Sequence, residues 1–175
     1  DFAGNKEKDL ITQFNEVKTI MEKKWPDSYY IGYFQANTNT FAPLPILKEK
    51  YEQILSLPNV IGLNIATRSD AITEECYNYL EELSKKTNLI VELGLQSIHE
   101  KTLKFINRGH DLQNFEQAIK ELQKRNIEVV VHIINGLPGE TKEHMIETVK
   151  YLNNLKINGI KIHMLHIIEN TDLAD

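Results

Sequence analysis

The apolar residues of the chain follow two spacings that change along the sequence. Where they recur every three or four positions they predict amphipathic helices, and where they form short runs between polar or turn residues they predict buried strands. Helices are predicted at 6–24 and 44–57, and from Thr73, Ser97, Asp111 and Thr141 onward. Strands are predicted at 29–35, 60–66, 89–95, 128–134 and 160–168. Helices and strands that alternate in this way build a parallel sheet.

Three of the helix starts carry a capping side chain. Ser97 and Glu100 form a Ser-x-x-Glu pattern, in which the serine oxygen accepts from a backbone N–H of the first turn and the glutamate reaches back. Asp111 and Thr141 stand directly before two later helices, where a side-chain oxygen accepts from an unpaired backbone N–H. The sequence therefore predicts that helices begin at these positions.

Successive side chains of a strand point to opposite faces, and each of the last four predicted strands has one wholly apolar face. These faces, which we expect to lie under helices, consist of Ile61, Leu63 and Ile65; Leu89, Val91, Leu93 and Leu95; Val129, Val131 and Ile133; and Ile160, Ile162 and Met164. The opposite faces carry Asn64, Glu92, Gln96, His132, Lys161 and His163. Helices on one side and polar residues on the other favour an α/β fold, a full or partial TIM-type barrel, over a doubly wound sheet. A functional site is then expected inside the barrel and at the carboxyl ends of its strands.

The composition is that of an ordinary globular chain of one domain. It has 41% hydrophobic and 26% charged residues, and its net charge of −5 is spread along the chain, so no basic patch indicates a nucleic acid. No apolar run approaches the roughly 20 residues that span a bilayer, so no membrane segment is predicted. The single cysteine, Cys76, lies on the buried face of a predicted helix; it excludes an internal disulfide and indicates a reducing, cytoplasmic location. The chain has no initiator Met, and we expect it to be a piece of a longer protein.

The polar residues allow more than one kind of chemistry. Glu92, His132, His163 and His166 would suit a metal-dependent hydrolase, because carboxylate and imidazole bind zinc. His163 and His166 are three positions apart, however, and would point to opposite faces of one strand. The turn at 135–140 precedes a helix and either holds an anion or links strand and helix tightly. A non-catalytic barrel used for binding also remains open.

Several longer motifs resemble a known superfamily. The segments VELGLQSIHEKTLKFINRGH, HIINGLPGET and GIKIHMLHIIENT closely resemble the core of radical S-adenosylmethionine (radical SAM) enzymes. The nearest resemblance is to an uncharacterised bacterial branch of iron–sulfur oxidoreductases with a core like that of the Elongator catalytic subunit, and it spans essentially the whole chain. It implies a partial (β/α)6 barrel, of which about five parallel strands and their helices are expected here.

In these enzymes three cysteines hold a [4Fe–4S] cluster, which binds and reductively cleaves S-adenosylmethionine, and the resulting radical abstracts hydrogen from a substrate. The resemblance therefore implies both cofactors and an unknown substrate, with tRNA or another macromolecule as the candidate by analogy with Elongator. The chain departs from the family because it has no cysteine triplet. Residues 1–175 are thus expected to be a radical SAM core truncated before its first, cluster-binding strand and at its C-terminus, and inactive alone. Strand 29–35 would then be an exposed edge, which favours self-association.

The resemblance also assigns cofactor-binding residues. Gln96 and Arg108 correspond to positions that contact the ribose and the carboxylate of the cofactor. A side-chain amide suits ribose hydroxyls, and the forked guanidinium suits a carboxylate. An alternative role for Arg108 is to cap the carbonyl end of a helix beside Gly109.

Further positions follow from the same resemblance. His132 matches a polar cofactor contact, and Ile134 and Gly136 match part of the adenine-binding pattern. Gln35 begins a loop, 35–38, that stands where many relatives have a glycine-rich loop recognising the cofactor's amino group. The predicted pocket is completed by two residues that face inward by alternation, Asn64 and Glu92.

Overall fold

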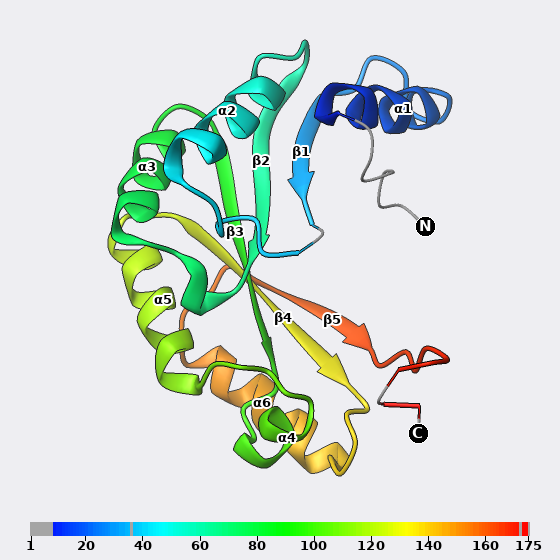
Figure 1. Ribbon diagram of the computed structural model, residues 1–175, viewed down its shortest axis with the longest axis vertical. Coiled ribbons are helices and arrows are strands. Elements are labelled where there is room, and N and C mark those ends of the chain that lie inside the picture. Colours follow the sequence, from blue (N-terminus) through cyan, green and yellow to red (C-terminus); the bar gives the residue numbers. More distant parts are fainter. Residues whose placement is uncertain (1–8, 36, 172, 175) are drawn as a thin grey trace.

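A computed structural model describes residues 9–35, 37–171 and 173–174 (Figure 1). The start of the helix expected at 6–24 and Ala36 in the loop at 35–38 lie outside these residues. The helices are α1 Leu10–Glu22, α2 Leu44–Leu55, α3 Glu74–Ser84, α4 Glu100–Phe105, α5 Leu112–Lys124 and α6 Lys142–Asn153, with a 3-10 turn η1 at Ser69–Ala71. The strands are β1 Tyr30–Phe34, β2 Val60–Thr67, β3 Asn88–Gln96, β4 Glu128–Asn135 and β5 Gly159–Met164.

The five strands form one parallel sheet in the order β1-β2-β3-β4-β5, so neighbours in sequence are neighbours in the sheet. Figure 1 shows this sheet curled, with α2, α3 and α5 along its outer, convex side. Consecutive strands with helices on one side form the wall of a barrel, whereas a doubly wound sheet reverses its strand order. The predicted α/β partial TIM-type barrel is therefore confirmed, and β1 lies at one edge of the sheet as expected.

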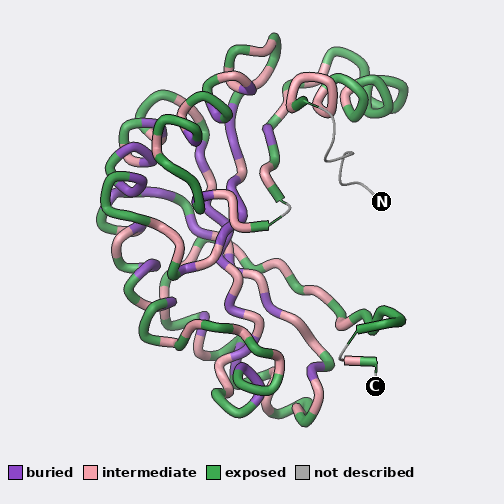
Figure 2. The backbone as a smooth tube through the Cα atoms, viewed as in Figure 1, coloured by how far each residue is buried: buried purple, intermediate pink, exposed green. Residues whose placement is uncertain are grey.

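The core lies between the sheet and the helices on its outer side. The apolar faces predicted for β2, β3 and β4 are buried there, apart from Ile61, which is 41% exposed. Tyr51 of α2, Cys76 of α3 and Phe115 of α5 belong to the same buried cluster, and Figure 2 shows buried residues following the strands and the helix turns that face them. Full burial of one such side chain contributes about 2 kcal/mol. The convex side thus stabilises the fold and leaves the concave side available for polar groups.

The prediction that the apolar face of β5 lies under a helix is wrong. Ile160, Ile162 and Met164 are 37%, 60% and 75% exposed. Helix α6, which precedes β5, buries only Thr148 and Leu152 among its described residues. In the described part of the chain β5 is an edge strand, so its outer face lacks the cover that a central strand receives from helices on both flanks.

Two of the three predicted helix caps are confirmed. The Asp111 carboxylate accepts from the backbone N–H of Asn114 at 2.8 Å, and the Thr141 hydroxyl accepts from that of His144 at 3.5 Å. Each such cap is worth about 1 kcal/mol. The last strand is shorter than predicted, because β5 ends at Met164.

The Ser97–Glu100 capping box is wrong. Helix α4 has His99 at its N-cap, without a side-chain cap, and the Ser97 hydroxyl accepts from the backbone N–H of His99 at 3.1 Å and donates to the Glu140 carboxylate. The cause is the residue before it: Gln96 has φ 72°, which turns the chain at the end of β3 and delays the helix. None of the described helices is long and apolar enough to span a membrane.

Candidate functional site

One connected group of polar side chains lies on the concave face of the sheet, and every strand contributes to it. We call this group the interior network; it consists of Tyr33 from β1, Asn64 from β2, Glu92 from β3, His132 from β4, and Lys161 and His163 from β5. Strand alternation places these side chains inward. In the parallel register Tyr33 lies beside Asn64 and His132 beside Lys161, whereas Glu92 is two residues further along than the partner of Asn64 and two residues before the partner of His132.

Glu92 is the centre of the interior network and is only 5% exposed. Its Oε2 atom accepts from the Tyr33 hydroxyl at 2.7 Å and from Nε2 of His132 at 2.5 Å. Its Oε1 atom accepts from the amide of Asn64 at 3.2 Å. The ammonium of Lys161 lies 3.5 Å from Oε2 and donates to the Tyr33 oxygen at 2.5 Å. A buried carboxylate is thus fully hydrogen-bonded and matched by one positive charge, as burial of a charge requires.

These contacts shift the protonation of the interior network. Burial raises the pKa of Glu92, but the hydrogen bonds from His132 and Tyr33 and the charge of Lys161 outweigh it and lower this pKa from 4.5 to about 2. Burial and the hydrogen bond to Glu92 raise the pKa of Tyr33. Burial, the neighbouring His132 and the charge of Lys161 lower the pKa of His163. At neutral pH the network therefore holds an ionised Glu92, a neutral phenol and a neutral His163.

A second group lies at the carboxyl end of β3, where Arg108 and Gln96 converge over Gly94. One guanidinium nitrogen of Arg108 donates to the carbonyl oxygen of Gly94, while its Nε is buried without a hydrogen-bond partner among the described residues. A Cβ atom at Gly94 would lie 2.9 Å from Nε2 of Gln96 and 3.1 Å from a guanidinium nitrogen of Arg108. Only glycine therefore lets these two side chains approach the strand.

The side chain of Arg108 does not cap α4. Its backbone N–H donates to the carbonyl of Leu103 at 2.9 Å, whereas its guanidinium points to β3. Burial, and then the charge of Arg68, lower the pKa of Arg108 to about 10. A half-buried guanidinium with an unused donor and a second cation beside it is a site that attracts an anion.

The remaining predicted site residues lie outside the interior network and outside the group around Arg108. Ile134 is half-buried and lies beside His163 in the register of β4 and β5. Gly136 follows β4 with φ 87°, and a Cβ atom there would meet nothing within 4 Å. Gln35 is exposed just after β1. Within the described residues, Gln35 and Gly136 take no part in the interior network or in the group around Arg108.

Three residues of this region had no assigned role in the sequence reading. Tyr33 could have been found from the glycine before it, because a glycine inside a strand marks a close approach on the packed side and its neighbour then faces the other way. The structure shows this approach: a Cβ atom at Gly32 would lie 2.5 Å from the Ile54 side chain of α2. Lys161 was expected to face inward but without a partner. Arg68 binds Asp70 through two hydrogen bonds of 2.9 and 2.6 Å, and no local pattern relates it to Arg108.

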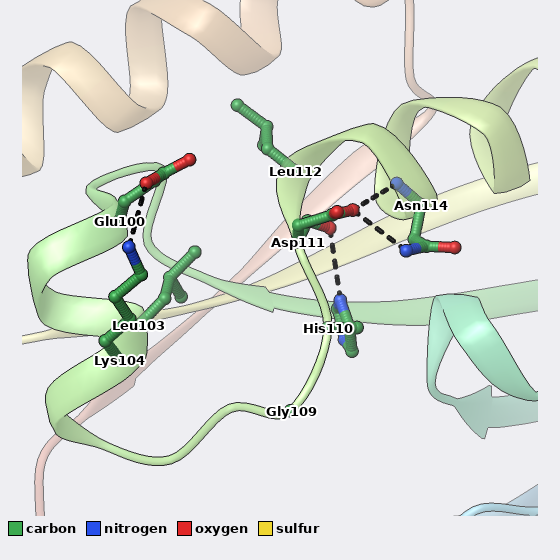
Figure 3. A pocket seen from close by; sticks show the side chains of 8 residues that line it. All are labelled: Glu100, Leu103, Lys104, Gly109, His110, Asp111, Leu112 and Asn114. Atoms are coloured by element: carbon green, nitrogen blue, oxygen red, sulfur yellow. Dashed lines mark hydrogen bonds and ion pairs between the residues drawn. The ribbon is translucent and has the colours of Figure 1, made fainter.

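A cavity of about 400 Å³ lies between α4 and the start of α5, next to the segment that carries Arg108 (Figure 3). It is lined by Glu100, Leu103, Lys104, Gly109, His110, Asp111, Leu112 and Asn114. Its charged groups serve local structure: Asp111 caps α5 through Asn114, and Lys104 lies 3.4 Å from Glu100. The cavity therefore adjoins the candidate site without adding a free functional group to it.

The structure does not bring together the zinc ligands that a metal-dependent hydrolase would need. Among the described residues no group of three or more His, Cys, Asp and Glu side chains is arranged to hold a metal ion. Both ring nitrogens of His132 are within hydrogen-bonding distance of protein atoms, and His166 lies beyond the end of β5.

The chain matches the sequence profile of the radical SAM superfamily over residues 6–152, and it belongs to that superfamily. It is 49% identical over 174 residues to the uncharacterised protein YtqA of Bacillus subtilis, covering 99% of this chain and 54% of that protein. It is 30% identical over 118 residues to the tRNA uridine(34) acetyltransferase of Methanocaldococcus jannaschii, covering 66% of this chain and 21% of the relative. The chain thus spans about half the length of YtqA, and less of the acetyltransferase.

Two solved structures share the fold. The archaeal Elp3 of Methanocaldococcus infernus superimposes with a TM-score of 0.77 at 21% identity, covering 93% of this chain and 43% of Elp3. The radical S-adenosylmethionine methyltransferase TsrM of Kitasatospora setae, solved with cobalamin and a [4Fe–4S] cluster, superimposes with a TM-score of 0.58 at 15% identity over 90% of this chain and 29% of TsrM. S-adenosylmethionine and a [4Fe–4S] cluster are the cofactors of this superfamily, and its members similar to this chain include enzymes.

The residues present fit one of these cofactors and not the other. The unpartnered Nε of Arg108 and the amide of Gln96 offer donors suited to the carboxylate and hydroxyls of S-adenosylmethionine. An iron–sulfur cluster needs several thiolates, whereas the single cysteine, Cys76, is 1% exposed in the core and burial raises its pKa to about 11. No step through the cluster can therefore be derived from these residues.

Proposed function

We propose that the whole protein is a radical SAM enzyme that reductively cleaves S-adenosylmethionine, and that Arg108 and Gln96 hold the cofactor's carboxylate and ribose. The observation that carries this proposal is the half-buried side chain of Arg108, whose buried Nε atom has no hydrogen-bond partner in the described chain. Leaving such a donor unpaired costs about 1–3 kcal/mol. An anionic ligand at this place would recover that cost.

When bound and reduced, S-adenosylmethionine supplies a 5′-deoxyadenosyl radical that can abstract hydrogen. The chain's own part is to bind and orient: Arg108 forms a charge-assisted bond to a carboxylate, and Gln96 directs its amide toward hydroxyls. Adenine contacts are proposed for Ile134 and Gly136 at the end of β4. Asn64, Glu92 and His132 are proposed to line the inner wall, and Gln35 the opposite rim.

The substrate is proposed to be a macromolecule, with tRNA as the first candidate. Support comes from the similarity to an enzyme named for tRNA uridine(34). The net charge of −5 gives this segment no overall attraction for RNA phosphates, so we expect most phosphate contacts to come from other parts of the protein. We also propose a cytoplasmic location, in keeping with the single, unpaired Cys76.

The test is cofactor binding by the whole-length protein carrying its reconstituted cluster. Arg108→Ala should weaken binding of S-adenosylmethionine roughly ten- to a hundredfold, as expected for a charge-assisted hydrogen bond worth about 1.5–3 kcal/mol. Arg108→Lys should recover part of the loss, because an ammonium lacks the guanidinium fork. Titration calorimetry gives the affinity and thermal denaturation the stability of each variant.

Lys104→Ala is the matched control, since Lys104 is an exposed cation on α4 close in sequence to Arg108. It should leave the affinity unchanged. If Arg108→Ala lowers the melting temperature but a folded sample binds S-adenosylmethionine as tightly as the wild type, Arg108 is a structural residue and the proposal fails.

A further inference from the structure

Two guanidinium groups lie at the carboxyl ends of the neighbouring strands β2 and β3. Arg68 directly follows β2, whose last residue, Thr67, lies beside Leu93 of β3, so the backbone of Arg68 reaches the level of Gly94. The carbonyl oxygen of Gly94 in turn accepts from the guanidinium of Arg108. Two cations from different loops therefore lie at the same end of the sheet.

The guanidinium of Arg68 lies next to Gly109, the residue that follows Arg108. A Cβ atom at Gly109 would lie 3.3 Å from Nη2 and 3.8 Å from Nη1 of Arg68. Gly109 also has φ 82°, so its conformation and the approach of Arg68 both favour a residue without a side chain. The absence of a side chain at Gly109 therefore brings Arg68 close to the segment that carries Arg108.

Asp70 holds the guanidinium of Arg68 in place and leaves part of it unused. Its carboxylate accepts from Nε at 2.9 Å and from Nη2 at 2.6 Å, and a pair of parallel hydrogen bonds fixes the plane of the guanidinium. Among the described residues Nη1 of Arg68 makes no hydrogen bond. The side chain is 41% exposed, so a ligand can reach Nη1 from solvent.

One positive charge at this end of the sheet has no matching carboxylate. Arg68 is paired with Asp70, whereas Arg108 forms no ion pair in the described part of the chain. His110 adds no charge at pH 7, because burial and the charge of Arg108 lower its pKa below the ordinary 6.5. A single carboxylate would balance the site, whereas a phosphate group carries up to about two negative charges and would exceed the balance.

The ion pair of Arg68 and Asp70 presents its positive end to Arg108. The charge of Arg68 lowers the pKa of Arg108 and the charge of Asp70 raises it, and the effect of Arg68 is the larger of the two. Two like charges held near each other repel, and an anion that binds to both relieves this repulsion. The pair therefore strengthens the attraction of the site for an anion.

We infer that Arg68 is a second anion-binding residue of the site around Arg108, and that the two guanidinium groups together take one carboxylate. The inference rests on the proposed function, under which this carboxylate belongs to S-adenosylmethionine. The unpartnered Nε of Arg108 and the unused Nη1 of Arg68 are the donors, and the two oxygens of a carboxylate can accept from both. Arg68 then distinguishes ligands that carry the carboxylate from ligands that lack it.

The experiment compares S-adenosylmethionine with decarboxylated S-adenosylmethionine, which lacks the carboxylate but keeps the amine, the sulfonium, the ribose and the adenine. Titration calorimetry on the whole-length protein, with its reconstituted cluster kept oxidised so that the cofactor is not cleaved, gives a dissociation constant for each ligand. Arg68→Ala should raise the constant for S-adenosylmethionine about three- to tenfold and leave that for the decarboxylated analogue unchanged. Arg68→Lys should recover part of the loss, because it keeps the charge without the fork.

Lys104→Ala is the matched control, because it also removes one positive charge near this segment. It should change neither dissociation constant. If Lys104→Ala weakens S-adenosylmethionine as much as Arg68→Ala does, the effect belongs to net charge and the inference fails. If Arg68→Ala does not fold, as thermal denaturation would show, Arg68→Gln keeps most of the side chain without its charge and is compared on the same two ligands.

Two further results would overturn the inference. A variant of Arg68 that weakens both ligands equally would show that this residue only supports the turn η1, and one that weakens neither would show that it does not touch the ligand. The outcome for Arg108 is separate: if Arg108→Ala weakens S-adenosylmethionine and Arg68→Ala does not, the proposed function stands and only the role of Arg68 is lost. Unchanged affinity in both variants would remove both.

Discussion

The Nζ atom of Lys161 lies 2.5 Å from the hydroxyl oxygen of Tyr33, although these residues belong to β5 and β1, the two edge strands of the sheet. In a flat sheet four strand spacings would separate those edges by about 19 Å, further than a lysine and a tyrosine side chain can reach together. The contact is therefore possible only because the sheet curls, and it joins both edges to Glu92 on the central strand. Lys161 also lies 4.4 Å from the centre of the Tyr33 ring, which adds a cation–π attraction.

Glu92 should make the fold sensitive to acid. Because its folded-state pKa, about 2, lies below the ordinary 4.5, ionised Glu92 stabilises the folded state above pH 4.5, and this stabilisation is lost as the pH falls toward 2. The difference between the two values corresponds to about 3 kcal/mol. The free energy of unfolding of Glu92→Gln, measured by urea denaturation from pH 7 to pH 2, should therefore approach that of the wild type as the pH falls.

Glu128→Gln, at the exposed start of β4, is the control for loss of a carboxylate as such. Its difference from the wild type should stay nearly constant over the same range. A Glu92→Gln protein whose difference from the wild type is equal at pH 7 and pH 2 would mean that the interior network does not hold Glu92 ionised.

Gln96 should carry backbone strain at the candidate site. Its φ of 72° lies in the left-handed region, which costs a residue with a Cβ atom about 1 kcal/mol and costs glycine almost nothing. Gln96→Gly should therefore be about 1 kcal/mol more stable than Gln96→Ala in thermal or urea denaturation, while both lose the amide that we assign to the cofactor ribose.

Asn126 offers a matched comparison, because it has φ 56° at the end of α5 and lies outside both polar groups. Asn126→Gly and Asn126→Ala should differ in stability in the same direction, without any effect on cofactor affinity in the whole protein. Equal stability of the Gly and Ala variants at position 96 would show that the left-handed conformation is not retained.

The edge strand β1 should promote self-association of the 175-residue chain. One side of β1 has no neighbouring strand in the described sheet, and unpaired backbone groups on a sheet edge recruit another chain. Ile31, on this strand, is 47% exposed. Ile31→Lys should raise the dissociation constant of the self-associated form by about tenfold, because a charge on an edge opposes pairing. Sedimentation velocity over a concentration series measures this constant.

Ile20→Lys adds the same charge on α1, at a residue that is 66% exposed but lies on a helix. If this variant weakens association as much as Ile31→Lys, the contact is not an edge-to-edge pairing. A wild-type chain that is monomeric at all concentrations would contradict the prediction directly.

Much of the candidate site follows from local pattern. Alternation along β2, β3 and β4 places Asn64, Glu92 and His132 inward, because the direction of a side chain in a regular strand depends only on its position. The caps Asp111 and Thr141 are local in the same sense, since each binds a backbone N–H three residues away.

Local pattern failed where the backbone departs from regular geometry. The register between β3 and β4 shifts between Gly94 and Gln96, as it does at a β-bulge, so strict alternation no longer determines the direction of Gln96. The same turn moved the start of α4 past Ser97, whose hydroxyl binds Glu140, 43 residues away, instead of closing a capping box. A short motif could not predict a partner so distant in sequence.

The sequence by itself determined the order of the elements and which residues face inward. Hydrophobic periodicity separates the strand residues that pack under the helices from those that face the concave side of the sheet. Only the tertiary structure decided which inward residues meet. Tyr33 and Lys161 are 128 positions apart and touch because the sheet curls, and the side chain of Arg108, in the segment after α4, reaches the Gly94 carbonyl because that glycine leaves room. Curvature and close approach arise from packing of the whole chain, so no window of sequence contains them.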